Sequence, residues 1–215
     1  YTDHILMTTD ERVLTEAENL FRFLKKRKKP SHGTSLTFNH LLVAQFNLQS
    51  RFLDLIDREI AHARNGLPAS IVIKLNNLEE KVMIGKLYEA SRAGVSISLI
   101  IRGICCLIPG VDGMSENIRV IRIVDRYLEH GRIFIFHNNG KQEIFMGSSD
   151  WMDRNLYRRI EVCFPIYKKV IKDEINKMID LQLNDNVQAV SIDSKGHIIP
   201  VSAKEGQEIL QSQRA

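Results

Sequence analysis

The sequence has few of the residues that stabilise small secreted domains or hold a chain in a bilayer. It has three cysteines, Cys105, Cys106 and Cys163, an odd number of which two are adjacent. Their apolar, strand-like surroundings favour buried, reduced thiols over disulfides, and therefore a cytoplasmic location. The longest uncharged apolar run, around Val95 to Ile101, is far shorter than the roughly 20 residues of a membrane span. We expect a soluble chain, and the sequence leaves peripheral membrane association open.

Composition is that of a globular protein. The 215 residues are 44% hydrophobic and 26% charged, enough to bury one large core or two modest ones. The net charge of +4 favours anionic partners, and the block from Lys25 to Lys29 supplies this excess. Such a block is more often a solvated loop than a specific anion site. The sequence opens on Tyr1 without a signal-peptide pattern, so we interpret it as a piece of a longer protein.

Hydrophobic periodicity predicts an α/β chain whose strands crowd into the second half. The expected helices are 10–24, 49–64, 78–92 and 167–183, and the expected strands are 41–44, 70–75, 95–101, 118–124, 132–137, 143–146, 160–164, 189–192 and 198–201. Asn76 and Asn77 are expected to start the third helix, Gly94 to end it, and Lys204 to begin a terminal helix. Strand, helix and strand over 70–101 form a βαβ unit, which places Arg102 at the carboxyl edge of a parallel sheet, where ligands usually bind.

A second group of polar residues surrounds the expected strand 132–137. His130 and Arg132 lie two positions apart at its start, so both side chains should point to one face and address one anion together. Beyond the hairpin turn at 138–140, Ser148 and Ser149 offer backbone N–H groups and hydroxyls to a phosphate. Asp150 could orient the imidazole or cap the next turn.

An imidazole near its unperturbed pKa can accept a phosphoryl group or move a proton. His130 is therefore a candidate catalytic residue. The plain alternative is a strand-edge histidine with a structural role. Three neighbouring features, Arg102, Arg132 and the hydroxyl-bearing turn, make the catalytic interpretation the better one.

The arrangement resembles the His-x-Lys and Gly-Ser-x-Asn pattern of the phospholipase D superfamily, in which two such half-sites face each other. Arg132 stands where that family has lysine, and Asp150 stands where it has asparagine. These departures argue against a phosphodiesterase, because a guanidinium clamps phosphate in a bidentate manner while an ammonium acts as a point charge.

A longer resemblance concerns the bacterial polyphosphate kinase family that works through a phosphohistidine. Three stretches carry it: Ile-Arg-Gly-Ile-Cys-Cys-Leu-Ile-Pro-Gly-Val at 101–111, Met-Ser-Glu-Asn-Ile-Arg-Val at 114–120, and Trp-Met-Asp-Arg-Asn-Leu with Arg-Arg-Ile-Glu-Val across 151–162. The likeness covers effectively the whole chain and is densest between Ile100 and Pro165.

This resemblance implies an enzyme of four domains that reversibly transfers the γ-phosphate of ATP to inorganic polyphosphate. The transfer would use Mg²⁺ in a tunnel between two phospholipase-D-like lobes. Residues 1–36 would be the end of the first lobe and a basic connecting loop. Residues 37–215 would be the second lobe, a mixed sheet flanked by helices. The histidine that becomes phosphorylated and the magnesium-site residues would precede Tyr1, so no metal ligand can be assigned here.

The resemblance also implies roles for individual residues. His130 matches the second essential histidine, a proton donor or acceptor opposite the phosphohistidine. Arg102 matches an arginine that contacts nucleotide phosphates, and Tyr1 matches a tyrosine that touches the nucleotide. Arg159 falls near the phosphates, as Arg132 would from its place beside His130. The implied partners are ATP or ADP and polyphosphate, without nucleic acid, in a homo-oligomer.

Structural interpretations compete with these roles. Arg102 could be an exposed loop arginine, and Arg158 and Arg159 could form surface ion pairs with Glu161 or Asp153. Placed arginines are nevertheless the side chains that recognise phosphate oxygens.

Two other functions stay open at this point. The first is a phospholipase-D-type phosphodiesterase or nuclease. The second is a non-catalytic module that binds polyanions through Lys25 to Lys29, Arg102 and Arg159. For the chain in isolation the second is a serious alternative, because catalysis requires both histidines to converge on one phosphate.

Overall fold

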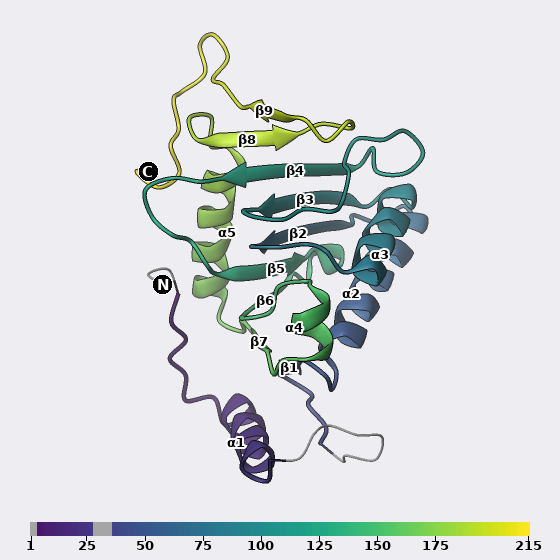
Figure 1. Ribbon diagram of the computed structural model, residues 1–215, viewed down its shortest axis with the longest axis vertical. Coiled ribbons are helices and arrows are strands. Elements are labelled where there is room, and N and C mark those ends of the chain that lie inside the picture. The colour runs from purple at the N-terminus through teal and green to yellow at the C-terminus, as the bar shows by residue number, and fades with distance from the viewer. Residues whose placement is uncertain (1–3, 28–35) are drawn as a thin grey trace.

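One mixed sheet organises the chain, and helices cover both of its faces in the computed structural model (Figure 1). The structure describes residues 4–27 and 36–215. The strands are β1 (Leu42–Val43), β2 (Ser70–Leu75), β3 (Ser96–Ile101), β4 (Ile118–Ile123), β5 (Arg132–Phe136), β6 (Glu143–Gly147), β7 (Val162–Pro165), β8 (Ala189–Ile192) and β9 (Ile198–Pro200). They are ordered β1-β7-β6-β5-β2-β3-β4-β8-β9. This confirms the predicted mixed sheet flanked by helices.

Three central strands are parallel and the remaining neighbours are antiparallel. β2 pairs with β3 from Ser70↔Ser96 to Leu75↔Ile101, and β3 pairs with β4 in the same direction. The predicted βαβ unit over 70–101 is therefore confirmed. The helices are α1 (Glu11–Lys25), α2 (Leu48–Arg64), α3 (Lys81–Arg92), α4 (Asp153–Tyr157) and α5 (Lys169–Leu183).

Two apolar layers hold the sheet between the helices. On one face, α2 and α3 cover a core in which the Phe52 ring lies 4.3 Å from Phe134 and 5.5 Å from Trp151, measured between ring centroids. On the other face, α5 buries Ile175 and Ile179 against β-branched residues of the central strands. The β-branched and aromatic residues of these strands suit a sheet that is buried on both sides.

The third helix begins later than Asn76 and Asn77 predict. α3 starts at Lys81, and Glu80 caps it by accepting the Met83 N–H at 2.8 Å. The segment before it runs as an extended loop, in which Leu78 pairs with both Cys105 and Trp151. Asparagine followed by an apolar run imitates a helix start. Here tertiary pairing decides the local conformation instead.

The predicted terminal helix is also wrong, since residues 204–215 form turns and extended chain. Backbone groups there bond to residues after α5: Leu210 N donates to Asn186 Oδ1 at 2.8 Å, and Ser212 N donates to Asp185 Oδ2 at 2.7 Å. Gly206, with φ of 79°, adds a left-handed bend that a helix would not accept.

Some other expectations have mixed outcomes. Cys163 is buried and Cys105 half-buried, but Cys106 is exposed, contrary to the expectation of three buried thiols. The turn at 138–140 is confirmed as the link between β5 and β6.

None of the helices in the described part of the chain has the length and apolarity to cross a membrane.

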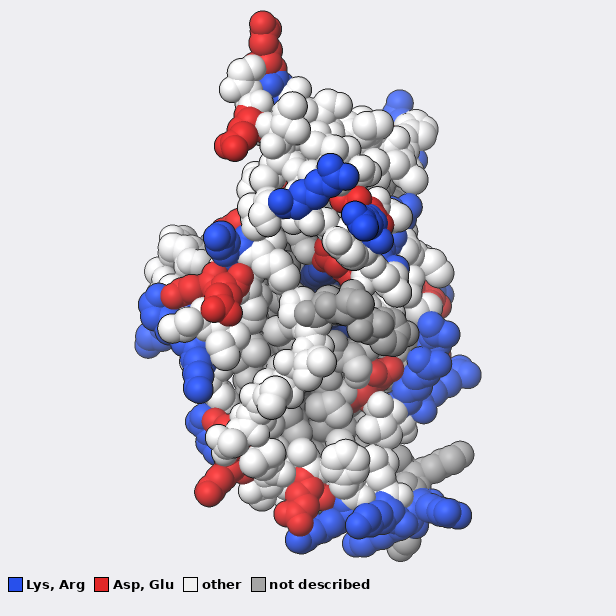
Figure 2. All heavy atoms as spheres, turned by 90° about the vertical axis from the view of Figure 1, so that its left-hand side faces the viewer, with Lys and Arg blue, Asp and Glu red and all other residues white. Residues whose placement is uncertain are grey.

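The basic block is described in part. Lys25 ends α1, and Lys26 and Arg27 follow it as exposed residues, while Lys28 and Lys29 lie outside the described residues. Figure 2 shows Lys and Arg side chains gathered at the lower end of the molecule, where α1 ends.

We expect Phe52→Ala to lower the free energy of unfolding by about 3–5 kcal/mol, because it removes a fully buried ring and leaves a cavity beside four other aromatic rings. Urea denaturation followed by circular dichroism measures this. The matched control is Phe21→Ala on α1, where the ring is 67% exposed and the change should stay within about 0.5 kcal/mol. Equal losses in both variants would contradict the assignment of this core.

Candidate active site

Polar side chains from five strand ends meet at one edge of the sheet. β2, β3 and β6 run in one direction and end at this edge, whereas β5 and β7 run in the opposite direction and begin there. The residues just beyond these ends are Asn76, Arg102, Asp150, His130 and Glu161. The sheet topology therefore brings together side chains that are as much as 85 positions apart (76 to 161) in the chain.

A cavity of about 760 Å³ opens at this edge. Four arginines and two carboxylates line it, and both carboxylates are buried and hydrogen-bonded. Its charged and imidazole-bearing residues are His4, Arg102, His130, Arg132, Asp150, Arg154, Arg159 and Glu161. The excess of guanidinium groups makes the cavity suited to a polyanionic ligand.

Arg102 and His130 meet in this cavity, as predicted. Arg102 Nη2 lies 3.4 Å from His130 Nδ1, and both residues are half-buried. Asn76 fixes the pair: its Oδ1 accepts from Arg102 Nε at 2.8 Å, and its Nδ2 donates to the His130 carbonyl at 3.4 Å. The amide of Asn76 thus orients a guanidinium and an imidazole-bearing backbone at once.

Asp150 ties the base of the cavity together. Its Oδ1 accepts the backbone N–H groups of Asn76 at 2.8 Å and Asn77 at 3.2 Å. Its two oxygens also accept from Arg132 Nε at 3.2 Å and Nη2 at 3.0 Å. These bonds explain why the chain does not enter a helix at Asn76. They also assign Asp150 to a structural junction rather than to a simple turn cap.

Arg132 lines the same cavity as His130, but its side chain is turned toward the buried carboxylate of Asp150. Its side chain is 9% exposed, and its charge is matched by Asp150. Its Nη1 donates to the His130 carbonyl at 2.7 Å. Arg132 therefore acts on the backbone that carries His130. A buried guanidinium needs this pairing, because an unmatched buried charge is very costly.

The turn after β6 differs from the predicted phosphate cradle. The Ser148 N–H donates to Val162 O at 3.1 Å, and its hydroxyl donates to the buried carboxylate of Glu161. Ser149 is fully buried, and its hydroxyl donates to the Asp150 carbonyl at 3.0 Å. Ser148 lines the cavity, whereas Ser149 supports it from below.

Gly147 allows β7 to approach this turn. A Cβ at that position would lie 2.3 Å from Val162 O and 2.5 Å from Cys163 Sγ, so a side chain would force the strands apart. Burial raises the pKa of the Cys163 thiol to about 12, which keeps it protonated and unreactive.

The remaining predicted residues have different positions. Arg159 is exposed and lines the cavity. Arg158 instead forms an exposed ion pair with Asp153 at 3.2 Å, which is the structural role weighed for it above. Tyr1 lies outside the described residues. In the chain from 4–27 and 36–215, no group of three or more His, Cys, Asp or Glu side chains could hold a metal ion.

Several site residues escaped prediction. Asn76 had the pattern of a helix cap, His4 lines the cavity without any motif of its own, and Arg154 lies in the quoted run 151–156 but was given no role. The Glu161 carboxylate accepts hydrogen bonds from the Ser148 hydroxyl and the Asn155 amide, and so connects the turn after β6 to α4. For Asn76 the available signal was its position directly after the predicted strand 70–75, which is where an α/β sheet gathers ligand-binding residues.

Comparisons with known proteins agree on one family. The family described as polyphosphate kinase C-terminal domain 2 matches residues 41–213. Polyphosphate kinase from Halalkalibacterium halodurans is 46% identical over 99% of this chain and 30% of its own length. That from Salmonella typhimurium is 44% identical over 91% of this chain and 28% of its own. The chain therefore spans less than a third of these curated relatives.

Solved structures give the same result. The crystal structure of polyphosphate kinase from Porphyromonas gingivalis matches 97% of this chain and 31% of its own, with a TM-score of 0.90 at 41% identity. A more distant structure, the phospholipase D family member Nuc from Salmonella typhimurium, matches 65% of this chain and 91% of its own, with a TM-score of 0.46 at 15% identity.

We expect Asp150→Ala to lower the free energy of unfolding by roughly 3–5 kcal/mol, because it leaves the buried Arg132 charge and two buried N–H groups without their acceptor. The matched control is Asp153→Ala, which breaks an exposed ion pair and should cost below about 1 kcal/mol. Chemical denaturation of both variants makes the comparison. A loss for Asp150→Ala no larger than for Asp153→Ala would contradict the junction role.

Proposed function

The chain belongs to the polyphosphate kinase family, and we propose that it forms the C-terminal catalytic lobe of an enzyme that reversibly transfers the γ-phosphate of ATP to inorganic polyphosphate. The observation that carries this proposal is the arginine-rich cavity in which Arg102 lies 3.4 Å from His130. The family match over 41–213 supports the same activity for the longer protein.

The geometry fits what phosphoryl transfer asks of a protein. Such reactions depend on holding two reactants in line and on neutralising the charge of the moving group. Arg102, Arg154 and Arg159 line the cavity, and the described structure pairs none of their guanidinium groups with a carboxylate. Arg102 Nε donates to Asn76, but its Nη groups and the guanidinium groups of Arg154 and Arg159 are available for phosphate oxygens, which an arginine can bind in a bidentate manner.

His130 would act as the proton donor or acceptor during transfer. Its position beside Arg102 places an ionisable nitrogen next to a phosphate-binding group, which is where an acid or base must be. In this proposal the histidine that carries the phosphoryl group belongs to another part of the longer enzyme. The chain spans about 30% of its relatives, which leaves room for that part.

Magnesium would neutralise phosphate charge in the complete enzyme. The family resemblance places the magnesium-site residues before Tyr1, and the described residues contain no group of three or more His, Cys, Asp or Glu side chains that could hold a metal ion. We therefore propose that the metal ligands also come from another part of the protein. Contact of Tyr1 with the nucleotide, a cytoplasmic location and a homo-oligomeric assembly are further proposals that rest on the family resemblance.

A phospholipase-D-type phosphodiesterase is the weaker alternative. That chemistry uses a lysine where this chain has Arg132, and the Arg132 charge is already matched by the buried Asp150. A polyanion-binding module without catalysis is the better description of residues 1–215 in isolation, because one half-site cannot hold both reacting groups in line.

In the full-length enzyme, His130→Ala should lower polyphosphate elongation by at least about 100-fold, which is the scale of a lost general acid or base. Elongation with ATP is measured together with phosphohistidine formation on the enzyme. The matched control is His197→Ala in the exposed β8–β9 hairpin, which should keep the parental rate. Parental elongation by His130→Ala would show that His130 is structural.

Residues 1–215 alone should bind polyphosphate with strong salt dependence, because screening weakens contacts between phosphate and arginine. They should show no ATP-dependent chain synthesis. Arg102→Ala should lower the affinity by roughly tenfold, which is the effect of one charge-assisted contact. Arg92→Ala, at the exposed end of α3, removes the same charge and should have little effect. Chain synthesis by residues 1–215 would overturn the placement of the second half-site elsewhere.

A further inference from the structure

His130 lies on a loop outside the strands of the sheet. Residues 124–131 link β4 to β5 and belong to no helix or strand of the described chain. Tyr127 and Leu128 in this loop are 54% and 48% exposed. Asn76 and Arg132 bond to the His130 carbonyl at the end of the loop, so something else must hold the residues before it.

The C-terminal tail makes that contact through Gln213. Gln213 Oε1 accepts the Tyr127 N–H at 2.7 Å, and Gln213 Nε2 donates to the Tyr127 carbonyl at 2.9 Å. This side-chain amide pairs with one residue of the loop much as a neighbouring strand would. Gln211 adds a second contact, donating to Asp125 Oδ2 at 2.7 Å. In Figure 1 the C-terminus accordingly lies beside the loop that leaves β4.

Glu129, the residue directly before His130, joins the tail to the sheet. Its Oε1 accepts from Gln213 Nε2 at 2.9 Å, and its Oε2 accepts from Lys74 Nζ and Gln182 Nε2. Lys74 is buried near the carboxyl end of β2, and Gln182 is buried on α5. A buried ion pair with further hydrogen bonds has a strongly determined geometry. The carboxylate therefore has a fixed position, one residue from the imidazole.

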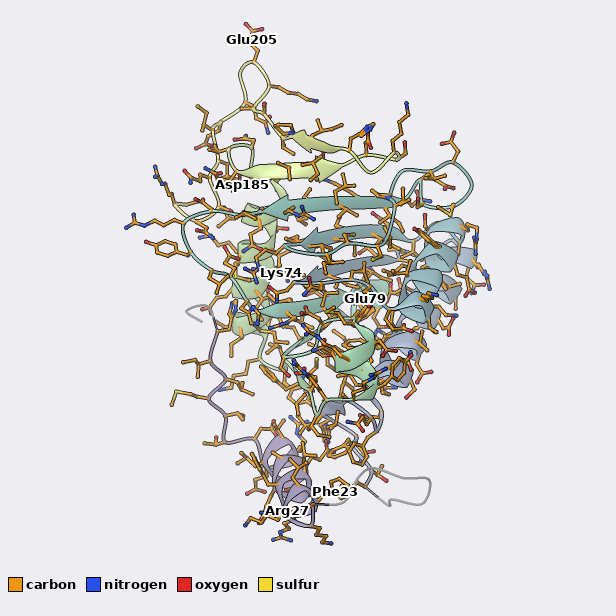
Figure 3. All side chains as sticks on the ribbon, in the orientation of Figure 1. Phe23, Arg27, Lys74, Glu79, Asp185 and Glu205 are labelled. Atoms are coloured by element: carbon orange, nitrogen blue, oxygen red, sulfur yellow. The ribbon has the colours of Figure 1, made fainter. Side chains whose placement is uncertain are left out.

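The tail is itself anchored where α5 ends. Asp185 is buried, and its Oδ2 accepts both the N–H and the hydroxyl of Ser212 at 2.7 Å. Burial alone would raise the pKa of Asp185, but the N–H and hydroxyl donors lower it below its ordinary value. Asn186 also pairs with Leu210 in both directions. Figure 3 shows Asp185 above Lys74, with Glu205 at the tip of the loop that precedes this anchor.

We propose that the C-terminal tail is a positioning element of the active site, in which Gln213 and Glu129 hold the loop 124–131 so that His130 faces Arg102. Neither residue lines the 760 Å³ cavity that His130 and Arg102 share, whereas both line a smaller adjoining cavity of about 180 Å³ together with Arg102. Their hydrogen bonds go to the loop and to its anchors, so in this proposal they act through the loop. Small displacements matter at such a site. A mutation far from the reacting atoms that misplaces a catalytic group by about 1 Å can lower the rate by about 100-fold.

This proposal rests on the role of His130 given above. The test uses the full-length enzyme with Gln213→Ala and Gln213→Met, the second of which keeps the side-chain length but removes the amide. Gln207→Ala is the matched control, because Gln207 lies in the same tail and bonds to Lys204 instead of the loop. His130→Ala reports separately on the histidine.

Two measurements are made on each variant. Hydrogen exchange followed by mass spectrometry reports protection of the Tyr127 amide and its neighbours in 124–131. Steady-state kinetics report kcat and KM for ATP. Both Gln213 variants should speed exchange in 124–131 by at least about tenfold and lower kcat by about tenfold or more, while KM for ATP stays within about twofold, since the loop positions the acid or base and not the nucleotide. Gln207→Ala should match the parent in both.

The outcomes separate the two proposals. Unchanged exchange in 124–131 would show that the tail does not hold the loop. Faster exchange with parental kcat, while His130→Ala abolishes elongation, would overturn the positioning role and keep the function of His130. Parental elongation by His130→Ala would overturn the function, and the positioning role with it, while exchange would still report whether the tail holds the loop. A parallel rise in exchange across the whole protein would mean general destabilisation and would overturn the specific role.

Discussion

The buried ion pair between Arg132 and Asp150 is the contact on which the rest of the site depends. One partner begins β5 and the other follows β6, and Asp150 also accepts the N–H groups of Asn76 and Asn77 after β2. Three strand ends are thereby fixed to one carboxylate. Because a buried charge is tolerated only with its partner, the two side chains have little freedom to move. The pair therefore fixes the positions of Asn76 and His130 relative to each other.

The arginines of this site consequently divide into two kinds. Arg132 has a structural role: it pairs with Asp150 and donates a hydrogen bond to the backbone carbonyl of His130. Arg102 stays in the cavity, oriented by the amide of Asn76, and Arg154 and Arg159 extend the positive lining. Arg102 and Arg132 are thus held in place by hydrogen bonds to Asn76 and Asp150, and such fixed charges are the condition under which electrostatic stabilisation of a ligand is most effective.

Much of the fold could be predicted because it depends on local patterns. The strand 70–75 was predicted with the bounds of β2, and the βαβ unit followed from one buried run, one amphipathic helix and another buried run. The two errors have a common cause. The supposed helix start at Asn76 and the supposed helix after Lys204 both looked favourable locally, but Asp150 and Asp185 bind the backbone there from far along the chain.

The sequence by itself determined the α/β class, the family resemblance and the places of Arg102 and His130 at strand ends, since buried runs and motif order are written in the residues. Only the tertiary structure decided which way each polar side chain turns. Arg132 and Ser149 looked as available as Arg102, yet Ser149 is fully buried outside the cavity lining, and the charge of Arg132 in that lining is already matched by Asp150. Likewise, the contact of Gln213 with the loop before His130 spans 86 residues between Tyr127 and Gln213, and no local periodicity encodes a hydrogen bond over that separation.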